Sequence, residues 1–79
     1  MPRYHFDIVL GGELIRDPVG QTCPDLEAAH HRAFGIAREM LGNPRIYGAH
    51  WSEAVFRIVL DGQEITTMPF SKSAKQVRS

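Results

Sequence analysis

The fold is decided by residues 54–68, which read AVFRIVLDGQEITTM. Residues 54–60 are the most continuously apolar run of the chain, and such a run predicts a central strand that is covered on both faces. The Asp61-Gly62 pair that follows suits the positive φ angles of a two-residue hairpin turn. Residues 63–68 return as a more polar strand, so this stretch is predicted to be a β-hairpin whose first strand lies inside a sheet.

A second hairpin is predicted near the N-terminus. Residues 4–10 alternate between apolar and other side chains with the period of two that is typical of a strand. Two glycines separate them from residues 13–16, and a glycine pair between two such runs favours a tight turn. In that register Ile8 lies opposite Ile15, which would place both side chains on the same face of the sheet.

One amphipathic helix is predicted between the two hairpins. Asp25 is a suitable N-cap, and the apolar side chains from Leu26 to Leu41 fall within an arc of about 160°. Residues 42–44, Gly-Asn-Pro, form a strong stop signal. One side of the helix is therefore expected to pack on the sheet while the other side meets water.

Together these elements predict an α+β fold with the order β-hairpin, helix, β-hairpin. Because the first and third strands are the most apolar, we place them in the middle of a four-stranded, mainly antiparallel sheet. The predicted strand order is 2-1-3-4, with the helix packed on one face. Residues 1–70 are expected to form a single domain, and residues 71–79 a disordered basic tail.

Length, cysteine content and charge narrow the class of protein. With 79 residues the chain has room for one domain with a thin core. Cys23 is the only cysteine, and neither a membrane span nor a signal peptide is apparent, so we expect a cytoplasmic protein with no membrane attachment. Residues 1–70 hold six basic and nine acidic side chains, a balance of −3, which argues against a nucleic-acid partner.

Five segments of the chain carry a resemblance to a known family. They read MPRYHFD at the start, DPVG from residue 17, CPDLEAA from residue 23, REML from residue 38 and MPFS from residue 68. In this order they resemble a family of small bacterial domains of unknown function that open Met-Pro-Arg-Tyr. The chain departs from the usual pattern at His30, at His31 and in residues 44–50. The resemblance implies a single cytosolic domain, and no catalytic residues come with it.

No catalytic, cofactor-binding or metal-binding set of residues is apparent. Glu27 and His31 have the i, i+4 spacing that two metal ligands on a helix can have, but no His-x-x-x-His or Cys-x-x-Cys accompanies them, which favours an ordinary surface pair. Cys23 has no basic side chain within three residues and is expected to be a packing or surface cysteine. His30 falls inside the apolar arc and is expected to be half-buried.

The best functional candidate is the loop predicted over residues 43–53, which contains Tyr47, His50 and Trp51. Tryptophan and tyrosine are common anchors of protein interfaces, so these three residues are predicted as a partner-binding site. The alternative is that Trp51 caps one end of a small core. We favour the core interpretation, because Trp51 stands three positions before the predicted central strand.

These observations favour a non-enzymatic protein-interaction or assembly module without a cofactor, acting as a homo-oligomer or with a protein partner. An open edge strand of the predicted sheet would be a ready site for strand addition. The alternative is a nucleic-acid-linked regulator that resembles a small antitoxin domain. Its layout of hairpins and helix is comparable, but that comparison is one of shape alone.

Overall fold

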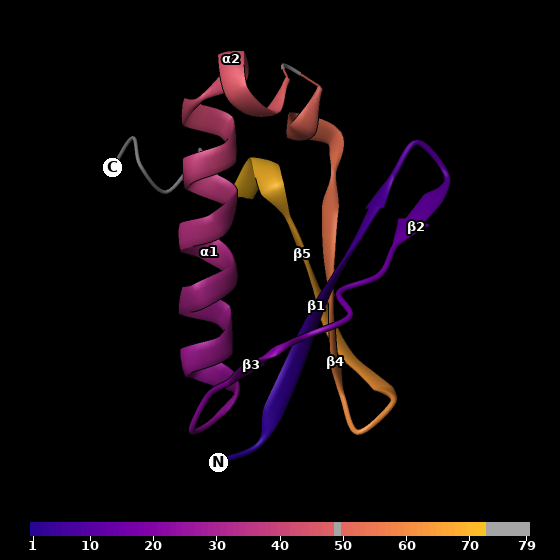
Figure 1. Cartoon of the computed structure of the whole chain (residues 1–79), viewed down its shortest axis with the longest axis vertical. Helices are drawn as coiled ribbons and strands as arrows, with labels where there is room; N and C mark the ends of the chain where they lie inside the picture. The colour runs from indigo at the N-terminus through magenta and orange to yellow at the C-terminus, as the bar shows by residue number, and fades with distance from the viewer. Residues whose placement is uncertain (49, 73–79) are drawn as a thin grey trace.

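The computed structural model describes residues 1–48 and 50–72, and it confirms the predicted α+β fold of hairpin, helix and hairpin (Figure 1). A long helix lies along one side of an antiparallel sheet. In chain order the elements are β1 (Arg3–Leu10), β2 (Glu13–Ile15), β3 (Gln21–Thr22), α1 (Leu26–Gly42), α2 (Pro44–Tyr47), the 3₁₀ turn η1 (Trp51–Glu53), β4 (Val55–Leu60) and β5 (Gln63–Pro69).

The four predicted strands pair in the order β2-β1-β4-β5, which puts the predicted first and third strands at the centre. The sheet differs from the prediction in having a fifth strand, β3, which also pairs with β1. Ile8 lies opposite Ile15 as expected. Because β2 pairs with one end of β1 and β3 with the other, the two short strands share one edge of β1, while β4 pairs along the opposite edge.

The core lies between α1 and the sheet. The helix contributes Ala29, Ala33 and Ala37, three fully buried side chains that are spaced by one turn. Such small side chains let the helix backbone approach the strands closely. Larger buried side chains come from the rest of the chain: Tyr4, Phe6, Phe56, Ile58, Met68 and Phe70. The helix begins as predicted, because the Asp25 carboxylate accepts a backbone N–H of the first turn at 2.9 Å.

Strand β4 is covered on one face only, so the prediction that both faces are covered is wrong. Phe56 and Ile58 point towards α1 and are buried, whereas Val55, Arg57 and Val59 on the opposite face are half-buried. The apolar run misled the prediction because valine is also favoured on half-buried strand positions. One helix shields one face, and an antiparallel sheet can leave its other face open to water.

The connection between β2 and β3 is organised by the side chain of Asp17. Its carboxylate accepts backbone N–H groups from Phe6, Val19 and Gly20 at 3.1, 3.2 and 3.0 Å. Its own N–H donates to Oδ1 of Asp7 at 2.9 Å, and Asp7 is only 6% exposed. The turn therefore supplies hydrogen-bond partners to Phe6 and Asp7 in the middle of β1. This part of β1 lies between the end that pairs with β2 and the end that pairs with β3.

The same contacts set the pKa of Asp17. Burial alone would raise this pKa, but the N–H groups of Phe6, Gly20 and Val19 and the nearby His5 together hold it below the ordinary value of 3.8. A carboxyl group whose pKa is lower in the folded state than in the unfolded state stabilises the fold above its unfolded pKa. That stabilisation is lost as the pH falls through the lowered, folded-state pKa.

We expect Asp17→Asn to lower the free energy of unfolding at pH 7 by about 2 kcal/mol, because an amide replaces a charged acceptor of three N–H groups. The difference from the wild-type protein should begin to shrink as the pH falls below about 4, where the unfolded chain takes up the proton, and should shrink further as the pH falls through the lowered pKa of the folded-state carboxyl group. Urea denaturation at pH 7 and at pH 3 measures both effects. Asp61→Asn, in an exposed turn, is the matched control and should change stability by a few tenths of a kcal/mol. An equal loss at both pH values would contradict the assignment.

The end of the domain is closed by Phe70. Its side chain is fully buried, and its N–H donates to the carbonyl oxygen of Ala54 at 2.9 Å. The predicted disordered tail, residues 71–79, lies outside the described residues except for Ser71 and Lys72. Within the described chain, no helix combines the length and the apolar character needed to cross a lipid bilayer.

Candidate protein-interaction surface

The segment between α1 and β4, predicted as a loop, contains the two helical turns α2 and η1. Asn43 is the C-cap of α1, and Pro44 takes the first position of α2, where the N–H that proline lacks is not needed. Gly48 ends α2 with a φ of 99° and donates its N–H to the carbonyl of Pro44 at 2.8 Å. A Cβ atom on Gly48 would stand 2.9 Å from Cε1 of His50, so glycine leaves room for this ring.

Trp51 links this segment to the core. Its ring stacks on Phe70, with centroids 6.2 Å apart and an interplanar angle of 20°, and Phe70 in turn lies 4.6 Å from Phe56. The His50 ring also stacks on the indole at 5.2 Å. The indole N–H donates to the carbonyl of Tyr47, which ties the end of α2 to the start of η1. Four rings thus connect exposed His50 with fully buried Phe56.

The outer side of this segment exposes apolar side chains. Ile46 is 74% exposed and Tyr47 is 37% exposed. We call Ile46, Tyr47, His50 and Trp51 the aromatic end; α2 and η1, which carry these residues, lie where α1 finishes and β4 begins (Figure 1). Apolar side chains that gather on a surface, rather than being scattered, are typical of protein-interaction sites.

The structure brings the three predicted site residues together. His50 and Trp51 are stacked, and Tyr47 is joined to Trp51 through its carbonyl. Trp51 is half-buried and packs against the core, so it supports the site from beneath. Ile46 was missed because its loop shows no periodicity. The available signal was an isoleucine beside a tyrosine just after the Pro44 helix start.

The other sequence candidates lie elsewhere. Cys23 is a free and fully buried thiol in the core. His30 is half-buried as expected, and its Nε2 atom has no hydrogen-bond partner. Glu27 and His31 are both exposed on α1. Among the described residues, no group of three or more His, Cys, Asp or Glu side chains is placed to hold a metal ion.

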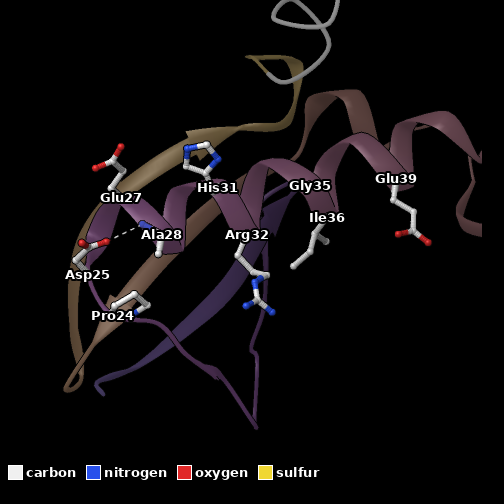
Figure 2. A pocket seen from close by; sticks show the side chains of 9 residues that line it. All are labelled: Pro24, Asp25, Glu27, Ala28, His31, Arg32, Gly35, Ile36 and Glu39. Carbon is white, nitrogen blue, oxygen red and sulfur yellow. Dashed lines mark hydrogen bonds between the residues drawn. The ribbon is translucent and has the colours of Figure 1, made fainter.

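A groove runs along the outer side of α1 (Figure 2). Its lining residues are Pro24, Asp25, Glu27, Ala28, His31, Arg32, Gly35, Ile36 and Glu39. Gly35 contributes no side chain, so the groove passes over the helix backbone at that point. Arg32 donates from Nη1 to Oε1 of Gln21 at 2.7 Å, which connects α1 with β3.

The fold and these surfaces define a small two-layer α+β domain in which one helix covers one face of an antiparallel sheet. A family model described as "Domain of unknown function (DUF6894)" matches residues 3–71, and the chain belongs to this family. The resemblance to a domain family of unknown function is therefore confirmed. No curated protein and no solved structure gives a significant match to the chain.

Proposed function

We propose that the chain is a small non-enzymatic protein-interaction or assembly module that contacts a protein partner through the aromatic end. The observation that carries this proposal is the 74% exposure of Ile46 on a turn that Trp51 anchors to the core. Covering an isoleucine side chain contributes about 1.5–3 kcal/mol. A surface held in place before binding loses less conformational entropy when it docks than a mobile loop does.

The edges of the sheet are less suited to partner binding than the sequence suggests. One edge of β1 is occupied by β2, β3 and the Asp17 turn. The edge strands of the sheet are β2, which has only three residues, and β5, which has a register shift opposite Ile58 and Val59 and ends at Pro69. Bulges and prolines are devices that hinder the addition of a further strand. The aromatic end is therefore the better candidate for binding a partner.

We place this module in the cytoplasm. The supporting observation is that Cys23, the only cysteine, is a free thiol in the core, which suits a reducing compartment. The aromatic end offers rings and an aliphatic side chain, so its partner is expected to be a protein surface with an apolar pocket that fits Ile46 and Tyr47.

We expect Ile46→Ser to weaken partner binding at least tenfold while the melting temperature changes by no more than about 2 °C, because the side chain is exposed. The measurement is quantitative mass spectrometry of proteins cross-linked to the tagged chain in its own cells, combined with a melting curve. Val19→Ser is the matched control, because Val19 is also strongly exposed, at 68%, but lies far along the chain from the aromatic end.

Two results would contradict this proposal in different ways. If Val19→Ser and Ile46→Ser reduce recovery of the same protein equally, the aromatic end is not the site. If the wild-type chain neither retains a protein nor associates with itself, it is not an interaction or assembly module.

A further inference from the structure

The outer side of α1 carries a regular stripe of small and charged residues. Positions that alternate four and three residues apart lie above one another on a helix. Along this stripe the residues are Ala28, Arg32, Gly35, Glu39 and Gly42. All are exposed except Ala28, which is half-buried. Figure 2 shows Arg32 and Glu39 projecting from the same side of α1, with Gly35 and the side chain of Ile36 between them.

This stripe is complementary to itself when it is inverted. At about 1.5 Å per residue, Arg32 lies about 4.5 Å from Gly35 towards the N-terminus and Glu39 about 6 Å towards the C-terminus. A two-fold axis through Gly35 would bring Glu39 of a second copy to within about 1.5 Å of the height of Arg32. It would also set Ala28 level with Gly42 of the second copy. Small residues then face small residues, and each charge faces an opposite charge.

Close approach of two helices is possible at the centre of this stripe. A Cβ atom built on Gly35 would have no atom within 4 Å, so the backbone is open to a neighbour there. Arg32 uses Nη1 to reach Gln21, and a guanidinium group has five N–H donors, which leaves others for a carboxylate. Glu39 is exposed on the same face of α1, about two turns after Arg32.

We propose that the chain forms an antiparallel homodimer through the outer face of α1, with Arg32 of each copy paired with Glu39 of the other. We infer that the partner is a second copy of the chain, because the same surface carries both the positive and the negative side chain. A two-fold interface requires a surface that is complementary to itself in this way. This inference rests on the assembly part of the proposed function and names its partner. It uses a surface separate from the aromatic end.

The test reverses one charge at a time. We expect Arg32→Glu and Glu39→Arg each to weaken self-association at least tenfold, because each change sets like charges against each other at two symmetry-related places. An equimolar mixture of the two variants should form a heterodimer, because opposite charges then meet at both places. The double variant R32E/E39R should associate as tightly as the wild-type chain. Sedimentation equilibrium at about 50 mM salt, where screening is weak, measures all four.

Arg38→Glu is the matched control, because Arg38 is an exposed residue of α1 that lies about 120° around the helix from Arg32. It should leave the dissociation constant within twofold of the wild-type value. Circular dichroism checks that each variant is folded. Should Arg32→Glu unfold through loss of its Gln21 contact, Glu39→Arg alone, whose side chain is exposed, decides the result.

Three outcomes would overturn the homodimer. They are a wild-type chain that is monomeric at several hundred micromolar, a dimer that neither charge reversal weakens, and a mixture that forms no heterodimer. A dimer that is insensitive to these reversals but dissociates with Ile46→Ser would place self-association at the aromatic end. That outcome would leave the proposed function standing and remove only the α1 interface.

Discussion

Phe70→Ala is expected to lower the free energy of unfolding by about 3–5 kcal/mol, a large share of the total for a chain of this size. The side chain is fully buried after the end of β5, and its ring contacts those of Phe56 and Trp51. Removing a buried aromatic ring costs about 3–5 kcal/mol. At about 0.05–0.15 kcal/mol per residue, a chain of 79 residues has only about 4–12 kcal/mol in total. Urea denaturation followed by circular dichroism measures the loss.

Phe70→Leu is the control for this change. Leucine fills most of the same space without an aromatic ring, so the expected loss is about 1–1.5 kcal/mol. If Phe70→Ala instead had the urea midpoint of the wild-type protein, the ring would contribute nothing to the fold. The contacts of Phe70 with Trp51 and Phe56, which connect the core with the aromatic end, would then not stabilise the fold.

The helix and both hairpins could be predicted because their signals are local. Asp25 caps α1 through a bond within the first turn, and the Gly42-Asn43-Pro44 stop lies next to the last helical residue. The glycines of the two hairpin turns have positive φ, as a turn of this length requires. Strand order followed from composition, since the two most apolar strands occupy the centre of the sheet.

The elements that were missed are short, and one of them, β3, also depends on a distant contact. Strand β3 has two residues, too few for a period, and it pairs with β1 after the chain has turned around Asp17. The α2 and η1 turns are short, and one hydrogen bond from Trp51 to the Tyr47 carbonyl joins them. A short window of sequence does not contain the pairing of β3 with β1, and the α2 and η1 turns are too short to show a period. The open face of β4 could have been predicted, because one helix can cover only one face of a sheet.

The candidate site was predicted by residue type and only partly by geometry. Tyr47, His50 and Trp51 were selected as aromatic residues in a long loop. The structure stacks His50 on Trp51 and joins Tyr47 to the indole through its backbone carbonyl. Ile46 was missed because its exposure could not be read from the loop sequence, although Pro44 was an available signal of a helix start. The stripe on α1 could have been predicted, because its spacing is visible in the sequence. Its charged residues were instead interpreted as part of a helix face that meets water.

Trp51→Ala is the second change with a large expected effect, and it separates the two interpretations of the tryptophan. The indole packs against the core and stacks on Phe70, yet it is only half-buried. A fully buried aromatic ring would cost about 3–5 kcal/mol, so we expect a loss of about 2–4 kcal/mol. Because Trp51 is the only tryptophan, the measurement is urea denaturation followed by circular dichroism rather than fluorescence.

Trp51→Phe divides that loss between packing and hydrogen bonding. Phenylalanine keeps a ring against Phe70 but has no donor for the Tyr47 carbonyl, so its expected cost is about 1 kcal/mol. If Trp51 supports the aromatic end from beneath, Trp51→Ala reduces both stability and partner binding, whereas Ile46→Ser reduces binding alone. A Trp51→Ala protein with wild-type stability that fails to bind its partner would instead make the indole a contact residue, and the core interpretation would be wrong.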